Sequence, residues 1–194
     1  MSDRQGIRAT WHKYDAGVYF VTICTDKREH LFGSISQSRF YPSELGKIVS
    51  EKLIEIPKYY PDAEIWNYVV MPNHVHFILA VGARLSAPAH ETISDAIETH
   101  PDKLGCLKPP RHGESVCYFH HNSRLSGIVG SFKAGVTRMA RARLIAPLHG
   151  QSGRIWQRNY HEHIIRNQHA YDNISDYIRT NVENWHRDCF NISM

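Results

Sequence analysis

Two apolar runs joined by a turn, VVMPNHVHFILAV at residues 69–81, constrain the fold more than any other stretch of the chain. Proline and asparagine are typical turn residues, so Pro72 and Asn73 indicate an antiparallel hairpin with strands over residues 63–71 and 74–81. Side chains alternate between the two faces of a strand. One face of the second strand therefore carries His74, His76, Ile78 and Ala80, and the other carries Val75, Phe77, Leu79 and Val81.

The remaining segments complete the pattern of an α+β domain. Residues 17–25 are rich in β-branched and aromatic side chains and predict a strand, whereas residues 31–41 predict a short strand pair or a loop. The order strand, helix, strand, strand, helix, strand is that of a ferredoxin-like (RRM-like) antiparallel sheet with helices on one face. Helical spacing of apolar residues predicts helices over 43–58, 123–144 and 169–188, and residues 154–166 are expected to form the fourth strand.

Length and composition favour a single domain. We expect it to span residues 1–194, with the proline-rich stretch 82–122 as an insertion or long loop. No apolar run approaches the ~20 residues that a membrane span needs, so no membrane association is expected. The scattered cysteines and the lack of a secretory h-region predict a cytoplasmic protein. A net charge of +4 permits a polyanionic partner without requiring one.

Two histidine pairs have the spacing of a metal site. His74 and His76 lie about 6.7 Å apart along the predicted strand, which lets both imidazoles reach one divalent ion. The alternative is that both are partly buried histidines bonded to their neighbours. His161 and His163 have the same spacing, but the charged residue between them favours a sheet edge or surface. This second pair is therefore a weaker candidate for a metal site.

A tyrosine and an asparagine in the predicted C-terminal helix could extend the first histidine pair. Tyr177 and Asn181 are four residues apart and so lie on one face of that helix. An amide oxygen is a suitable ligand for Mg²⁺ or Mn²⁺, and a tyrosine hydroxyl can attack a phosphate bound to such an ion. The alternative for Tyr177 is a residue that packs against the sheet with its hydroxyl in water.

Four segments in this order, VVMPNHVHFIL, IVGSFKAGVTR, IWQRNYHEHIIRN and YDNISDYIRTN, resemble the REP-associated tyrosine transposases, which are single-tyrosine HUH transposases. The resemblance covers residues 11–188 apart from the stretch 82–122. It implies a palm-like sheet that binds single-stranded DNA beside a hairpin, such as a REP-like element, and cuts one strand. The chain departs from many relatives after Asn181, where NVENW lacks a proline, so we expect the helix to continue.

The resemblance also assigns roles to the candidate residues. His74, His76 and Asn181 would hold Mg²⁺ or Mn²⁺, and Tyr177 in a C-terminal catalytic helix would be the nucleophile. Its attack would give a 5′-phosphotyrosine link and a free 3′-hydroxyl, and a second 3′-hydroxyl could reverse the step as strand transfer. Tyr160 and Tyr171 are alternative nucleophiles.

Basic and aromatic residues supply candidate DNA contacts. Cations neutralise phosphates and aromatic rings stack on bases, although each cation taken alone could be an ordinary solvated charge. The predicted DNA-binding residues are Arg124, Lys133, Arg138, Arg141, Arg154, Trp156 and Arg158.

Two other functions stay open at this point. One is a non-catalytic protein that binds single-stranded DNA or RNA hairpins and derives from such an enzyme. The other is a metal-dependent hydrolase with His161 and His163 as zinc ligands. The sequence also leaves open whether the protein is a monomer or a homodimer with exchanged helices.

Overall fold

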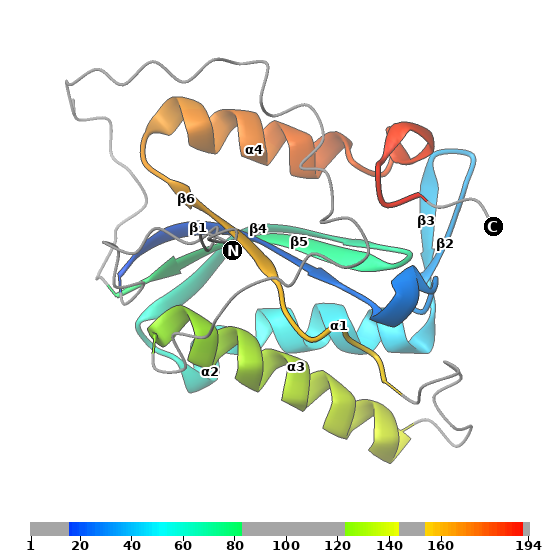
Figure 1. Cartoon of the computed structure of the whole chain (residues 1–194), viewed down its shortest axis with the longest axis horizontal. Helices are drawn as coiled ribbons and strands as arrows, with labels where there is room; N and C mark the ends of the chain where they lie inside the picture. Colours follow the sequence, from blue (N-terminus) through cyan, green and yellow to red (C-terminus); the bar gives the residue numbers. More distant parts are fainter. Residues whose placement is uncertain (1–15, 83–122, 144–153, 192–194) are drawn as a thin grey trace, which may run out of the picture.

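A four-stranded antiparallel sheet forms the centre of the computed structural model, which describes residues 16–82, 123–143 and 154–191. Its strand order, β4-β5-β1-β6, is that of a ferredoxin-like fold, which confirms the predicted fold class (Figure 1). The strands are β1 (Gly17–Cys24), β4 (Ala63–Met71), β5 (His74–Val81) and β6 (His161–Ile165).

Helices cover both faces of this sheet. The helices that connect the strands lie on one face, and the C-terminal helix lies on the other (Figure 1). A separate hairpin stands beside the sheet, and its strands over residues 33–42 confirm the strand pair, one of the two predictions for residues 31–41. These elements are α1 (Glu44–Ile54), α2 (Ile56–Tyr59), α3 (Arg124–Arg143), α4 (Gln168–Thr180), β2 (Gly33–Ser36), β3 (Arg39–Pro42) and the short 3₁₀ turns Asp26–Arg28 and Trp185–Arg187.

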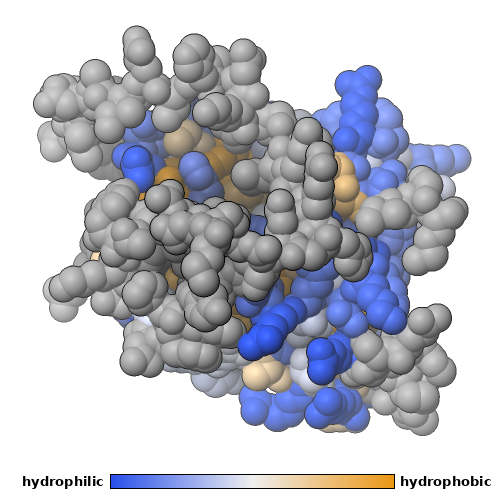
Figure 2. Space-filling model, viewed as in Figure 1, coloured by the Kyte–Doolittle hydropathy of each residue, from blue (hydrophilic) through white to orange (hydrophobic). Residues whose placement is uncertain are grey.

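The alternation of β5 divides the hydrophobic core into two clusters. Its odd-numbered residues, including Phe77 and Leu79, pack with α1 and α3 in the larger cluster. On the other face Ile78 packs with Ile174 and Ile178 of α4, and apolar side chains are visible in the layer between α4 and the sheet (Figure 2). Burial of each such side chain contributes about 1.5–3 kcal/mol. The predicted sorting of β5 side chains is confirmed, and it places both histidines on the α4 face.

Two predicted element boundaries are wrong. The fourth strand covers only His161–Ile165 rather than 154–166. Before it, Trp156 meets Thr25 in a single bridge, and the carbonyl groups of residues 157–159 accept hydrogen bonds from Lys133 instead of a neighbouring strand. A side chain therefore takes the place of a strand partner there.

The C-terminal helix also ends earlier than its apolar spacing predicts. α4 stops at Thr180, and at Asn181 the hydrogen bonding tightens to a three-residue turn with Ile178. The carbonyl oxygen of Thr180 at the helix end accepts from both the backbone N–H and the side-chain amide of Asn184. The expectation that the helix continues without a proline is therefore wrong.

Two remaining expectations concern the insertion and membrane-spanning helices. Beyond residue 82, the predicted insertion 82–122 lies outside the described residues, so the single-domain division stays a prediction. Among the described helices, none has the length and apolar character needed to cross a membrane.

A pair of glycine substitutions tests the packing of α1. A Cβ atom at Gly46 would collide with the backbone carbonyl oxygen of Phe32, whereas a Cβ atom at Gly130 on the exposed side of α3 meets nothing within 4 Å. We expect Gly46→Ala to lower the free energy of unfolding by more than about 2 kcal/mol, as steric overpacking does. Gly130→Ala should raise it by about 0.5–1 kcal/mol through helix propensity. Chemical denaturation measures both, and a neutral Gly46→Ala would contradict the close approach.

Candidate functional site

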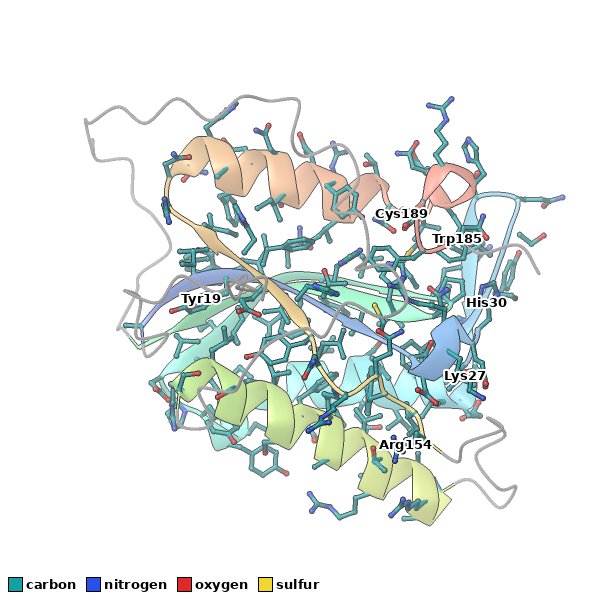
Figure 3. The ribbon with its side chains drawn as sticks, viewed as in Figure 1. Tyr19, Lys27, His30, Arg154, Trp185 and Cys189 are labelled. Atoms are coloured by element: carbon teal, nitrogen blue, oxygen red, sulfur yellow. The ribbon has the colours of Figure 1, made fainter. Side chains whose placement is uncertain are left out.

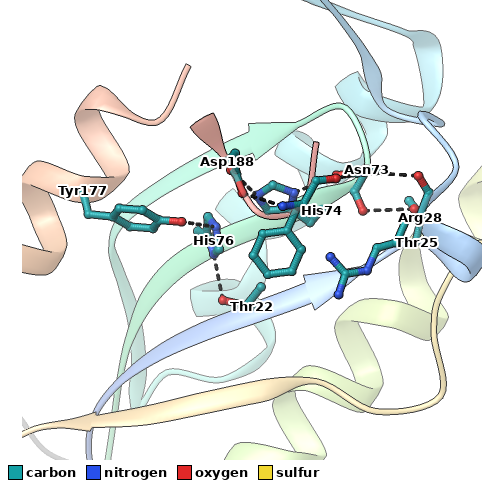
Figure 4. A network of polar contacts seen from close by, with 9 residues as sticks. Thr22, Thr25, Arg28, Asn73, His74, His76, Tyr177 and Asp188 are labelled. Atoms are coloured by element: carbon teal, nitrogen blue, oxygen red, sulfur yellow. Dashed lines mark hydrogen bonds and ion pairs between the residues drawn. The ribbon is translucent and has the colours of Figure 1, made fainter. Parts of the chain in front are cut away.

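The two histidines of β5 lie side by side on the α4 face, where the strand begins. His74 is 0% exposed and His76 is 1% exposed, and their ring centroids are 4.4 Å apart. Strand register pairs His74 with Cys24 and His76 with Thr22 of β1. A tyrosine from α4 and an aspartate from the C-terminal segment approach them (Figure 4).

The side-chain amide of Asn73 fixes the protonation of His74. Its Nδ2 donates to the backbone oxygens of Arg28 (3.2 Å) and Phe190 (2.8 Å), so its Oδ1 must face Nδ1 of His74, at 2.8 Å. An amide oxygen only accepts, and therefore Nδ1 of His74 carries the proton. Nε2 of His74 is left with a free lone pair, which is the form in which imidazole binds a metal.

His76 is held from both ring nitrogens. Thr22 Oγ1 lies 2.7 Å from Nδ1, and Tyr177 Oη lies 3.3 Å from Nε2. The ring of His76 also stacks on Phe20, at 5.2 Å between centroids. Burial lowers the pKa of His76 to about 3, and it lowers the pKa of His74 well below its usual value. Both imidazoles are therefore neutral at physiological pH.

Asp188 joins the histidine pair, and sequence reasoning missed it. Its side chain is 4% exposed, and burial raises its pKa. Oδ1 accepts from the backbone N–H of Phe190 at 2.8 Å, while Oδ2 lies 3.8 Å from Nε2 of His74. The ligand atoms of His74, His76 and Asp188 all lie within 4.8 Å of one another.

This group has the chemistry of a cation site. Among the described residues, neither Nε2 of His74 nor Oδ2 of Asp188 has a hydrogen-bond partner. Two buried acceptors facing each other without a donor are unfavourable, and a cation between them would satisfy both. Two imidazoles and a carboxylate are common ligands of divalent metals, so the residues present fit such an ion.

The structure places Asn181, the predicted third metal ligand, at the end of α4. Its side chain is buried, and its Oδ1 has no hydrogen-bond partner within the described part of the chain. An unsatisfied buried amide oxygen is compatible with a ligand role. That role stays a prediction.

Tyr177 is the predicted nucleophile that reaches the histidines. It is half-buried, and its ring packs edge-on against Phe20 at 6.1 Å. The alternative Tyr171 packs against Trp66 near the start of α4, and Tyr160 packs against the cluster on the opposite face of the sheet. The geometry thus favours Tyr177 among these three, although its role remains a prediction.

The second histidine pair lies on the edge strand β6, as its polar pattern predicts. His161 pairs in register with Thr22, and His163 pairs with Phe20. Within residues 16–82, 123–143 and 154–191, the group of metal-ligating side chains includes neither of them. A zinc site built on His161 and His163 gains no support from this arrangement.

The predicted DNA-binding residues lie mainly on or beside α3, across the sheet from the histidines. Arg124 forms an ion pair with Asp62, and Nζ of Lys133 donates to three backbone carbonyl groups. Burial lowers the pKa of Lys133 to about 8. Trp156 is buried between Phe32 and Phe132.

The other four predicted contacts are exposed arginines. Figure 3 shows Arg154 beside α3, while Trp185 and Cys189 of the C-terminal segment lie on the α4 side of the sheet. All seven DNA contacts stay predictions, but the geometry separates residues with packing roles from residues at the surface. The exposed ones are Arg138, Arg141, Arg154 and Arg158.

Neutral His76 should make the stability of the metal-free protein depend on pH. An unfolded histidine has a pKa near 6.5, whereas in the fold burial lowers the pKa of His76 to about 3. Between these values the unfolded chain binds more protons, so the free energy of unfolding falls as pH falls. From pH 7 to pH 5 the wild type should lose about 2 kcal/mol more than His76→Gln, measured by urea denaturation with a chelator. Equal losses in both proteins would contradict this assignment.

Comparison with known proteins gives the fold and a relative. No family model matches the chain. An uncharacterized protein of Haemophilus influenzae is 33% identical over 186 residues, which cover 95% of this chain and 91% of the relative. The solved structure of a REP-associated tyrosine transposase bound to a REP hairpin has a TM-score of 0.54 at 18% identity, covering 95% of this chain and 74% of that chain. The chain therefore belongs to the same family as the Haemophilus influenzae protein, and its fold is that of a REP-associated tyrosine transposase.

Proposed function

We propose that the protein is a transposase-type endonuclease and strand transferase that cleaves single-stranded DNA near a hairpin. The observation that carries this proposal is the position of Tyr177, whose Oη lies 3.3 Å from Nε2 of His76. A potential nucleophile therefore adjoins a buried group of metal-ligating atoms. That combination is what metal-assisted phosphoryl transfer to a tyrosine requires.

The proposed metal is Mg²⁺ or Mn²⁺, held by His74, His76 and Asp188, with Asn181 as a further ligand. Carboxylate and amide oxygens favour these hard cations, and the proton on Nδ1 of His74 leaves its Nε2 free to bind. When bound, a divalent cation would stabilise the negative charge that builds on the phosphoryl oxygens. The predicted ligands His74, His76 and Asn181 carry no negative charge. Asp188 adds a ligand that does.

The chain itself positions the nucleophile. Phe20 and His76 contact the ring of Tyr177, and Ile174 and Ile178 anchor α4 on the sheet. This packing limits the directions in which Oη can point and so lowers the entropic cost of attack.

The proposed reaction is a balanced exchange of phosphodiester bonds. Tyr177 Oη forms a bond to phosphorus and the bond to the 3′-oxygen breaks. The tyrosine loses a proton and the 3′-oxygen gains one. The products are a 5′-phosphotyrosine link and a free 3′-hydroxyl. Attack by another 3′-hydroxyl reverses the step and joins strands. No ATP is needed, because the phosphotyrosine ester retains the energy of the phosphodiester bond that was broken.

The proposed substrate is single-stranded DNA with a hairpin, such as a REP-like element. The similar solved transposase is bound to a REP hairpin, and this chain carries a net charge of +4. Exposed Arg138, Arg141, Arg154 and Arg158 lie across the sheet from Tyr177 and would contact DNA away from the cut. Because Lys133 and Trp156 hold the fold together, their substitution should reduce stability as well as binding.

Substitution of the nucleophile tests the reaction. Wild type, Tyr177→Phe and Tyr171→Phe would be mixed with 5′-end- and 3′-end-labelled hairpin DNA and Mn²⁺, then run on a denaturing gel. We expect a slow covalent band with the wild type and Tyr171→Phe, and none with Tyr177→Phe or with a chelator. Loss of the only attacking oxygen should reduce adduct formation by at least about a thousandfold.

Other outcomes of this assay point elsewhere. A band that persists in Tyr177→Phe would identify another tyrosine as the nucleophile. Firm hairpin binding by the wild type with no band in Mg²⁺ or Mn²⁺ would support the alternative function, a non-catalytic protein that binds single-stranded DNA or RNA hairpins.

Asp188→Asn tests the metal site by two measurements of opposite sign. The amide keeps Oδ1 for Phe190 and directs an N–H toward the free lone pair of His74, so the metal-free protein should become more stable by about 1 kcal/mol. Mn²⁺ affinity measured by calorimetry should fall by more than about tenfold. Asp176→Asn, an exposed change on α4, should alter neither. Unchanged Mn²⁺ affinity in Asp188→Asn would remove Asp188 from the ligand set.

A further inference from the structure

Arg28 lies in a strained turn at the end of β1. Lys27 and Arg28 both have left-handed backbone conformations, with φ of 51° and 61°. Each costs about 1–2 kcal/mol for a residue with a side chain. The turn is kept in place by hydrogen bonds from Asn73 Nδ2 to the backbone oxygen of Arg28 and from Thr25 Oγ1 to that of Glu29. Strain that surrounding contacts maintain is typical of functional sites.

The side chain of Arg28 extends from this turn toward the histidine pair (Figure 4). Its Cζ lies 4.2 Å from the ring centroid of Phe190, and the same ring lies 4.5 Å from the ring of His74. A single aromatic ring therefore contacts both the guanidinium and a proposed metal ligand. Stacking covers one face of the guanidinium, and its N–H groups point outward from the edge of that plane, away from the ring contact.

One donor on that edge is unsatisfied. Nη1 of Arg28 is buried and has no hydrogen-bond partner among the residues that the structure describes. Asp188 is near enough to interact electrostatically, yet in the described segments no ion pair within 4.0 Å joins it to Arg28. Two opposite buried charges that do not pair with each other indicate a different ligand for each. The cation proposed above would account for Asp188, which leaves Arg28 in need of an anion.

We propose that Arg28 binds a backbone phosphate of the DNA strand, either the scissile phosphate or the one next to it. A guanidinium presents two parallel N–H groups that match the non-bridging oxygens of a phosphodiester. Its position one ring away from His74 places that phosphate near the proposed metal ligands. This inference rests on the proposed function and names a residue that contacts the substrate at the site of cleavage.

A chemical double-mutant cycle tests the contact. Single neutral methylphosphonates replace each phosphate around the cut in a hairpin oligonucleotide. Binding is measured with Mn²⁺ in the Tyr177→Phe protein, which prevents cleavage. At one phosphate we expect the substitution to weaken binding by about tenfold, the loss typical of a charged hydrogen bond. With Arg28→Gln added, binding should be weaker throughout, and that position alone should lose its sensitivity.

Two further variants separate binding from folding. Arg39→Gln is the matched control because Arg39 also lies over an aromatic ring, Tyr41, but on the separate hairpin. It should leave the methylphosphonate pattern unchanged. Arg28→Lys keeps the positive charge and a long aliphatic side chain but loses the parallel N–H groups of the guanidinium. It should therefore reduce the sensitivity of binding to the methylphosphonate only in part. Arg28→Lys also serves if Arg28→Gln does not fold.

The outcomes distinguish this inference from the function on which it rests. If an Arg28 variant retains the wild-type pattern at every phosphate, while the wild type still forms the Tyr177 adduct, the inference is wrong and the proposed function stands. If the wild type neither binds nor cuts hairpin DNA, both are wrong.

Discussion

The hydrogen bonds of one buried residue, Asn73, connect His74 to the turn that carries Arg28 and to the C-terminal segment. Its amide nitrogen donates to the backbone oxygens of Arg28 and Phe190, and its amide oxygen accepts from Nδ1 of His74. Its own backbone oxygen accepts from the N–H and hydroxyl of Thr25. A buried amide that lost one of these partners would cost about 1–3 kcal/mol, so the three segments hold each other in place. The same network directs Nε2 of His74 toward Asp188.

The two faces of the sheet divide packing from chemistry. α1 and α3 bury the large cluster on one face, whereas α4 rests on a small one that includes Phe20, Ile78 and Ile174. With few apolar contacts, the placement of α4 depends more on polar ones. Asn67 Nδ2 donates to Ser175 Oγ at 2.8 Å, and Tyr177 meets His76. These polar contacts and the small apolar cluster together fix the position of α4 on the sheet.

Local sequence patterns predict the fold and part of the site. Alternation in β5 sets His74 and His76 on one face, and helical spacing sets Tyr177 and Asn181 on one face of α4, but only the family resemblance links Tyr177 to the histidines. Arg28 and Asp188 have no such pattern, because a strained turn and an irregular C-terminal segment bring them to the site through contacts distant in sequence.

The same limit bears on the two wrong boundaries. Apolar spacing continues through Val182 and Trp185, yet the backbone hydrogen bonding tightens at Asn181 and α4 ends at Thr180. In β6, Lys133 satisfies carbonyl groups that a longer strand would otherwise pair. Polar side chains that replace backbone partners leave no periodic signal. On the proposed function, the charges of the site follow the same logic: Asp188 and Arg28 stay apart in the described residues because each is placed for a ligand of opposite charge. Such preorganised charges stabilise a charged transition state without rearrangement at the moment of reaction.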